Sequence, residues 1–357
     1  MSSNTSAGQP DVDRVLRPLA DATAARGLDQ VAASLTELRD WLADDLQQLE
    51  HDLSTSVPER RTLSQKAAYH LIGQPGKRVR PLVTILSSRM AGNQPAIAKD
   101  LAVACELTHA ATLLHDDVLD EGTERRGAPT ARVVYGNSAS VLGGDHLLLE
   151  ALRRIRRAPH IELLDQMIDV IDKMVIAEAL QLERRESFVP LRERYLEVAE
   201  GKTAVLFAWG MYAGGLSGGL PQEHCDRLAS VGNDLGLSFQ AVDDCLDLSE
   251  HAHEIGKDVF ADIRDGKLTL PLIIACEKDA SLIDVLSNAA HKGEGLESPE
   301  AQQALLDKVR ATGCVEATRE EAMSWSQRAI QTLREIPHSE ARDALEAVIL
   351  TAVQRLF

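Results

Sequence analysis

Apolar side chains recur at steps of three and four residues through most of this chain, which is the spacing of one face of an α-helix. Between Leu28 and Leu53 they stand at Val31, Leu35, Leu38, Leu42, Leu46 and Leu49. Aromatic residues make up only 3% of the sequence, and no long stretch alternates apolar with polar residues as half-buried strands do. The pattern therefore predicts an all-α fold of roughly a dozen helices.

The helical pattern continues without a linker rich in Pro, Gly or Ser, so we expect one large domain over residues 28–357. Residues 1–27 begin with small and polar side chains and are predicted to form a flexible N-terminal tail. Ser298-Pro299-Glu300 has the residue types of a helix cap and first turn, which predicts a helix start there.

Charge and cysteine usage exclude several classes of function. A formal net charge of −17 argues against a general nucleic-acid binder, whose footprint is a basic face. The five cysteines lie far apart, which predicts no disulfide framework and is typical of a reducing cytosol. The chain starts without the features of a signal peptide, and no run approaches the roughly 18 apolar residues of a membrane span. We therefore expect a cytoplasmic protein without a membrane span.

Two aspartate clusters of equal spacing are the clearest functional signal in the sequence. Their members are Asp116, Asp117 and Asp120 in LLHDDVLDEGTERRG, and Asp243, Asp244 and Asp247 in SFQAVDDCLDL. On a helix, the first and third aspartates of such a DDxxD motif share one face. The carboxylates repel one another unless a cation neutralises them. One motif alone is most simply an exposed acidic helix end, whereas two motifs on facing helices of a bundle predict a shared site.

Aspartate oxygens favour Mg²⁺, which is usually bound by one or two carboxylates together with the phosphate oxygens of a substrate. The predicted ligand is therefore a diphosphate. Calcium storage is an alternative, but the sequence lacks an EF-hand loop with its central glycine and closing glutamate. Zinc usually takes His or Cys ligands, and no such cluster accompanies the aspartates.

Basic residues near the first motif predict a second anion site. The turn QPGKRVRPL carries Lys77, Arg78 and Arg80 directly before an expected helix. A solvated basic turn would explain this string alone. However, His109 precedes the first motif by one to two helical turns, and Arg125 and Arg126 follow it. Together these residues predict a metal-free anion pocket beside the metal-dependent one.

Seven segments match the motifs of one known family in that family's order. They are GKRVRP (76–81), LTHAATLLHDDVLDEGTERRGAPT (107–130), GNSASVLGGDHLL (136–148), AEALQLE (177–183), GKTAVLF (201–207), FQAVDDCLDL (239–248) and GKDVFADIRDGKLTLPLI (256–273). Over about residues 30–350 the chain resembles the trans-isoprenyl diphosphate synthases, the head-to-tail polyprenyl synthetases. The resemblance implies an all-α isoprenoid-synthase bundle around a deep central cavity, and a homodimer.

The resemblance also implies an activity, which is a Mg²⁺-dependent prenyl transfer. Isopentenyl diphosphate would be condensed with an allylic diphosphate, namely the dimethylallyl, geranyl, farnesyl or geranylgeranyl compound. Three Mg²⁺ ions are implied, with Mn²⁺ as a substitute. Contact with a membrane surface for product release is left open.

The family's site residues carry over position by position. The residues implied to hold Mg²⁺ on the allylic diphosphate are Asp116, Asp117, Asp120, Asp243, Asp244 and Asp247. Those implied to contact the same diphosphate are Arg125, Lys202 and Lys257, with Lys267 closing over it. Those implied to bind isopentenyl diphosphate are Lys77, Arg80, His109 and Arg126. Thr203 and Gln240 would present oxygen dipoles to the carbocation, and the released pyrophosphate would take the proton.

At other positions that match the family's motifs, two interpretations stay open. Glu178 and Gln181 match a helix that lines the family's cavity, where a structural role is equally open. His115 is either an ordinary core histidine or part of the site. Asp258, Val259 and Phe260 depart from the family pattern after Lys257, as does Gly143, which puts the details of substrate closure in doubt.

Product length is predicted from the helix before Asp116. In the family, bulky aromatic residues four or five places before the first aspartate stop chain growth early. Here those places hold Ala111 and Thr112, and Thr108 continues the same face. One helical turn advances about 5.4 Å, close to the length of an isoprene unit. We therefore expect a long product of about thirty to fifty carbons, and a geranylgeranyl or farnesyl product remains the alternative.

Two rival functions are less favoured by the motifs. A class I terpene cyclase shares the first acidic motif, but its second metal site is typically an Asn/Ser/Glu pattern and it needs no second anion pocket. A non-catalytic partner subunit usually loses acids from one motif, and both motifs are complete here.

Overall fold

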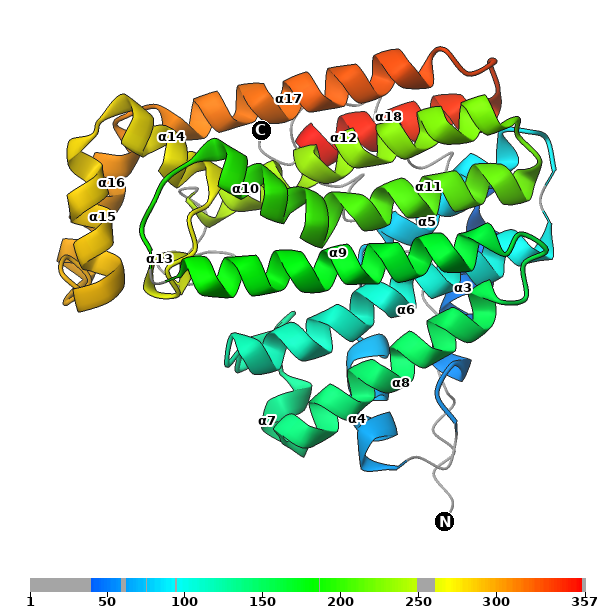
Figure 1. Ribbon diagram of the computed structural model, residues 1–357, viewed down its shortest axis with the longest axis horizontal. Coiled ribbons are helices and arrows are strands. Elements are labelled where there is room, and N and C mark those ends of the chain that lie inside the picture. Colours follow the sequence, from blue (N-terminus) through cyan, green and yellow to red (C-terminus); the bar gives the residue numbers. More distant parts are fainter. Residues whose placement is uncertain are drawn as a thin grey trace. The chain divides into compact units, whose positions relative to one another are not determined.

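The computed structural model of the chain describes residues 40–58, 62–74, 76–93, 95–185, 187–248 and 261–354 (Figure 1). The structure is 78% helical, with almost no strands among these residues, which confirms the predicted all-α class. The predicted tail, residues 1–27, and the motif residue Lys257 with its neighbours Asp258, Val259 and Phe260 lie outside the described residues. No helix within the described ranges is long and apolar enough to cross a bilayer.

The chain divides into two compact units, which are described separately. The first comprises residues up to Asp165, Gly210–Cys225 and Ser339–Val348. Its helices are α3 (Ala43–Thr55), α4 (Leu63–Ile72), α5 (Val79–Arg89), α6 (Ala96–Leu119), α7 (Ala131–Tyr135) and α8 (Asn137–Ile155), and its hairpin consists of β1 (Glu124–Arg125) and β2 (Ala128–Pro129). Helix α6 packs against α5 and α8, and α8 also packs against α4.

Helix α6 is the central element of the first unit, because its side chains are buried on most sides. Its core contacts come from leucines such as Leu101, Leu107 and Leu114, none of which is exposed to solvent. The helix ends at Leu119, so Asp116 and Asp117 lie in its last turn and Asp120 is its C-cap residue. The first acidic motif is therefore held at the end of a buried helix.

The second unit comprises Gln166–Trp209, Asp226–His338 and the residues from Ile349 onward. The remaining elements of the chain are α9 (Glu162–Arg184), α10 (Arg192–Ala199), the π-helix η1 (Glu200–Ala204), α11 (Val205–Gly218), α12 (Gln222–Asp247), α13 (Ala261–Arg264), α14 (Leu270–Lys278), α15 (Ser281–Lys292), α16 (Pro299–Arg310), α17 (Cys314–Leu333) and α18 (Glu340–Gln354). The Ser298 side chain accepts a hydrogen bond from the Ala301 amide at 3.2 Å, which confirms the predicted cap.

Two glycines let α12 approach the backbone of its neighbour. A Cβ atom added to Gly236 would lie 2.4 Å from the Cα atom of Ala204, and one added to Gly232 would lie 2.6 Å from the Phe207 carbonyl oxygen. Neither position could therefore hold a larger residue without displacing backbone. This close packing brings the next turn of α12, with Gln240, against Thr203 in η1.

The five cysteines fill the interior. All five are free and buried, so the prediction of no disulfide framework is confirmed. Burial raises the pKa of the Cys105 thiol to about 12, and burial together with the nearby Asp244 raises that of Cys245 to about 12. These thiols stay protonated at neutral pH and are poor nucleophiles.

Candidate functional site

The first acidic motif separates into two kinds of aspartate. Asp117 is only 3% exposed, and its Oδ1 atom accepts hydrogen bonds from Nε and Nη2 of Arg125 at 3.0 and 2.8 Å. Asp116 and Asp120 are both half-buried, and the Asp120 amide donates to the Asp116 carbonyl oxygen at 2.8 Å. The charge of Asp117 is thus offset within the protein, while the two outer aspartates remain partly accessible.

The β1–β2 hairpin, which the sequence did not predict, carries the two arginines. Arg125 pairs with Ala128 and Glu124 pairs with Pro129, which leaves Arg126 and Gly127 as a two-residue loop. Both loop residues have positive φ, +54° and +75°, as a type I′ turn requires. Arg125 and Arg126 therefore lie on adjacent positions at the tip of one tight turn.

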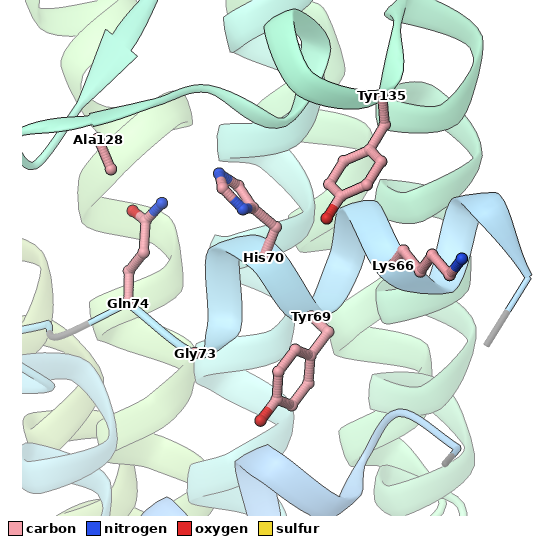
Figure 2. A pocket seen from close by; sticks show the side chains of 7 residues that line it. All are labelled: Lys66, Tyr69, His70, Gly73, Gln74, Ala128 and Tyr135. Atoms are coloured by element: carbon pink, nitrogen blue, oxygen red, sulfur yellow. The ribbon is translucent and has the colours of Figure 1, made fainter. Parts of the chain in front are cut away.

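A small pocket of about 330 Å³ is lined by residues of α4, the hairpin and α7 (Figure 2). His70 Nε2 lies 2.7 Å from the Pro129 carbonyl oxygen, and the rings of His70 and Tyr135 meet edge to face with centroids 5.8 Å apart. Figure 2 shows His70 between Gln74 and Tyr135, with Ala128 of β2 opposite Gln74. None of the predicted site residues lines this pocket. Its contacts hold the hairpin against α4 and α7.

The basic turn before α5 divides its charges between the interior and the surface. Arg78 is 5% exposed and has φ +46°; its guanidinium donates to Glu50 and to Glu106, each at 2.7 Å, and to the Ile72 carbonyl oxygen at 3.2 Å. Burial would lower the pKa of Arg78, but the two carboxylates raise it above its ordinary value. Lys77 is exposed and Arg80 is half-buried.

The basic turn and the hairpin tip meet near His109. A Cβ atom added to Gly76 would lie 3.0 Å from an Nη1 atom of both Arg126 and Arg78. Burial, followed by the charges of Arg80 and Arg126, lowers the pKa of His109 well below its ordinary value. Arg80 and Arg126 of the first unit thus lie close enough to His109 for their charges to act on its ring, and their role as a metal-free anion pocket stays a prediction.

His109 should make the stability of the chain depend on pH. Its pKa is lowered in the folded chain, so at pH values below about 6.5 the unfolded chain binds a proton that the folded chain does not. The contribution of the neutral His109 ring to the free energy of unfolding is therefore fully present above about pH 6.5. It is lost as the pH falls toward the lowered pKa of the folded chain. Melting temperatures measured at pH 7.5 and 5.5 should therefore differ more for the wild type than for His109→Gln. Exposed His291 provides the control, and equal shifts in wild type and His109→Gln would contradict the expectation.

His115 packs against α8. Its Nε2 atom is 3.1 Å from the Val141 carbonyl oxygen and 3.5 Å from Asp145. A Cβ atom on Gly144 would lie only 2.2 Å from the same nitrogen, so the glycine makes room for the ring. These contacts favour the structural reading of His115.

In the second unit, Lys202 and Thr203 lie in the π-helix η1. Short π-helical segments are rare and occur frequently at functional sites. Lys202 forms an ion pair with Glu178 and donates a hydrogen bond to Gln181 Oε1 at 2.8 Å, and both partners come from α9. Glu178 and Gln181 are thereby linked directly to a predicted site residue.

The second acidic motif is connected to Thr203 by a chain of hydrogen bonds. Thr203 Oγ1 donates to Gln240 Oε1 at 2.8 Å, and Gln240 Nε2 donates to Asp244 Oδ1 at 2.8 Å. The Leu270 amide at the start of α14 donates to Asp244 Oδ2 at 3.3 Å. Asp244 is 5% exposed and Asp243 is half-buried. The side chain of Asp247 lies outside the described part of α12.

Lys267 lies between α13 and α14, where it pairs with Asp265 at 3.4 Å. Among the described residues, no three His, Cys, Asp or Glu side chains gather into a group that could hold a metal ion by themselves. Asp116 and Asp120 of the first unit offer carboxylate oxygens, and so, separately, does Asp243 of the second unit. Such donors fit a hard cation that completes its coordination with substrate oxygens and water, as Mg²⁺ does.

The predicted length-determining residues are small and belong to α6. Ala111 and Thr108 are buried, and the Thr108 hydroxyl donates back to the Ala104 carbonyl oxygen at 2.9 Å. Thr112 is half-buried and donates to the His109 carbonyl oxygen at 2.8 Å. Both hydroxyls are satisfied within the helix, so these threonines present mainly their methyl groups to their surroundings.

Comparisons of sequence and of structure with known proteins all find polyprenyl synthases. A sequence profile of the family described as Polyprenyl synthetase matches residues 61–307. The chain is 31% identical over 323 residues to octaprenyl diphosphate synthase from Escherichia coli (strain K12), covering 90% of this chain and 99% of that relative. A decaprenyl diphosphate synthase structure from Rhodobacter capsulatus matches with a TM-score of 0.83 and 31% identity, covering 90% and 99% of the two chains. Polyprenyl synthase from Caulobacter crescentus CB15, solved with calcium and isoprenyl diphosphate, matches with a TM-score of 0.82 and 29% identity, covering 97% and 98%.

Proposed function

Because this chain belongs to the polyprenyl synthetase family and is a prenyltransferase that makes a polyprenyl diphosphate, we propose how its described residues divide the work of binding two diphosphates. The basic pocket around His109 binds isopentenyl diphosphate without metal. The two acidic motifs bind the allylic diphosphate through Mg²⁺. The observation that carries this division is the meeting of the basic turn with the hairpin tip beside a neutral His109.

Charge neutralisation decides which anion each pocket can take. Arg78 is buried and paired with Glu50 and Glu106, so we assign the binding of isopentenyl diphosphate to its more accessible neighbours Lys77 and Arg80 and to Arg126 of the hairpin. A neutral His109 can donate an N–H to a phosphate oxygen without needing a proton from solvent. The carboxylates of the first motif would repel an unaccompanied diphosphate, because like charges at short range are unfavourable. They need a divalent cation between them and their ligand.

The outer aspartates of the motifs are the proposed metal ligands. They are Asp116 and Asp120 of the first motif and Asp243 and Asp247 of the second. Bound there, Mg²⁺ would stabilise the charge that develops on the departing diphosphate oxygens. Calcium is present in the structure of the Caulobacter relative, and a divalent ion is the family's requirement. We propose three Mg²⁺ ions, with Mn²⁺ as a substitute.

Cationic side chains complete the allylic site. Arg125, which Asp117 holds, contacts the allylic diphosphate, and Lys202 leaves Glu178 and Gln181 to do so. Lys257, which lies outside the described residues, is proposed as a further contact to this diphosphate, and Lys267 closes over it. Thr203 and Gln240 direct oxygen dipoles at the allylic carbocation. The double bond of isopentenyl diphosphate attacks that carbon, and the released pyrophosphate accepts the proton.

The reaction is tested by incubating the purified protein with isopentenyl diphosphate, farnesyl diphosphate and Mg²⁺. Elongated diphosphates, separated by chromatography, are the expected products. A cyclic hydrocarbon would instead indicate a terpene cyclase. No turnover without a second protein would indicate a partner subunit.

We also propose a homodimer, because two helices expose apolar faces. In the first unit, α8 exposes Leu142 and Leu149, and in the second unit α9 exposes Ile168 and Val175, each to more than half. Contiguous exposed apolar side chains mark interaction surfaces, and most soluble oligomers pair identical subunits. Sedimentation of the chain as a monomer at micromolar concentration would contradict this proposal.

A long product of about thirty to fifty carbons is proposed from the small residues on α6. Ala111→Phe should shorten the product, because a ring at this buried position would fill the space into which the chain extends. Leu113→Phe, two residues along the same helix and on a different face, serves as the control. The length distribution is measured by chromatography after the diphosphates are hydrolysed. Products of unchanged length from Ala111→Phe would refute this account of length control and leave a shorter natural product open.

A further inference from the structure

We propose that Asp244 is a positioning residue. It determines that the oxygen of the Gln240 side-chain amide, and not its NH₂ group, faces Thr203. The two residues lie four apart on α12, so their side chains share one face of the helix. Asp244 is buried and each of its carboxylate oxygens has a partner: Oδ1 accepts from Gln240 and Oδ2 accepts from the Leu270 amide. The sequence pattern grouped Asp244 with the metal ligands, whereas these bonds give its carboxylate a different task.

The orientation of Gln240 follows from the chemistry of its neighbours. The two ends of a side-chain amide have almost the same shape, so only hydrogen-bond partners decide which end points where. An ionised carboxylate can only accept hydrogen bonds, and therefore the NH₂ group of Gln240 must face Asp244. Its oxygen must then face Thr203, whose hydroxyl donates to it at 2.8 Å. The proton of that hydroxyl is committed to Gln240, which leaves the lone pairs of Thr203 Oγ1 directed elsewhere.

Asp244 is itself held in place by the fold. The Leu270 amide is the first N–H of α14, at the positive end of that helix. Tyr195 lies nearby, and burial followed by the charge of Asp244 raises the pKa of its phenol well above the ordinary value. The carboxylate is thus surrounded by donors on α12 and α14 and by a neutral phenol on α10. These contacts hold the Asp244 carboxylate in one orientation.

The inference rests on the proposed function, in which Thr203 and Gln240 face the allylic carbocation. A carbocation is stabilised by the negative ends of dipoles that are already aligned before the reaction. With the observed orientation, the oxygens of Gln240 and Thr203 meet at one place. A reversed amide would bring N–H groups there and would oppose the developing positive charge.

Asp244→Asn tests this assignment, because it reverses the chain of hydrogen bonds without removing a link. The Asn oxygen must accept from the Leu270 amide, so its NH₂ group must face Gln240. Gln240 must then turn its own oxygen toward Asn and its NH₂ group toward Thr203. We expect kcat to fall at least about tenfold, since misaligned dipoles cost one or more orders of magnitude in rate.

A double variant supplies the rescue. In Gln240→Glu combined with Asp244→Asn, the new carboxylate accepts from the Asn NH₂ group and again presents an oxygen to Thr203. Its kcat should recover relative to that of Asp244→Asn. A merely structural role for Asp244 predicts no such recovery. Far-ultraviolet circular dichroism establishes that each variant is folded.

A binding measurement distinguishes a positioning role of Asp244 from a role as a metal ligand. The affinity for farnesyl thiodiphosphate, an unreactive allylic analogue, is measured by calorimetry with and without Mg²⁺. Asp244→Asn should bind it as the wild type does when Mg²⁺ is present, whereas Asp243→Asn should bind it much more weakly. Loss of Mg²⁺-dependent binding by Asp244→Asn, or an unchanged kcat, would overturn the proposal.

Failure of the proposed function would be seen first in the wild type, which would then not elongate farnesyl diphosphate. If the single variant does not fold, the double variant decides, because every donor in it again faces an acceptor. Retained elongation by the double variant would then support the positioning role, and its loss would overturn it.

Discussion

Asp116→Asn is expected to lower kcat about a thousandfold, the largest effect on the reaction among the substitutions considered. The change keeps the shape of the side chain and removes the negative charge that attracts Mg²⁺. Losing a metal contact to a departing diphosphate costs about 4 kcal/mol of transition-state stabilisation, which corresponds to that factor. Steady-state kinetics with farnesyl and isopentenyl diphosphates at saturating Mg²⁺ measures the loss.

The exposed Asp226, on the same chain but outside both motifs, provides the matched control as Asp226→Asn. Chelation with EDTA should abolish turnover in the wild type, and added Mg²⁺ should restore it. A kcat for Asp116→Asn within a few-fold of the wild type, or turnover that survives chelation, would exclude the proposed role of the first motif.

Arg78→Met should reduce the free energy of unfolding by about 3–5 kcal/mol, the range found when one partner of a buried ion pair is removed. Glu106 would be left buried without its cation, and Glu50 would lose its closest partner. The turn that carries Lys77 and Arg80 would also lose its anchor, so KM for isopentenyl diphosphate should rise while KM for the allylic substrate changes little. Denaturant unfolding and initial-rate kinetics measure the two effects.

Arg78→Lys is the informative comparison, because it keeps the charge and loses the fork that reaches both carboxylates. We expect the free energy of unfolding of Arg78→Lys, and its KM for isopentenyl diphosphate, to lie between the values of the wild type and Arg78→Met. The combination of Arg78→Met with Glu106→Gln should recover part of the stability, since the unpaired charge is gone. Equal stability of Arg78→Met and the wild type would show that the ion pairs contribute nothing net.

The sequence was sufficient for the helices, because they follow from local spacing. The apolar steps of three and four residues predicted helices, and the cap at Ser298 was predicted from three consecutive residues. The meeting of Arg80, His109 and Arg126 was expected from motif order. Their roles toward substrates remain predictions until the kinetic tests are made.

The details that spacing could not reveal depend on partners far apart in the chain. Arg78 turns inward because Glu50 and Glu106 lie there, and Asp244 is oriented by an amide in a later helix. The hairpin was missed because an Arg-Gly pair is not among the usual signals of a type I′ turn, which are Asn-Gly, Asp-Gly and Gly-Gly. The π-helix η1 likewise has no sequence signature in the spacing of its residues.

The burial of every cysteine makes the molecule easy to label at a chosen place. All five sulfur atoms belong to described residues and are sealed in the interior, so alkylating dyes should react with them slowly. A cysteine introduced at exposed Glu124, beside the arginine pair, would then be the fast-reacting group on the protein. A fluorophore attached there could report, in real time, how this hairpin responds when each diphosphate arrives.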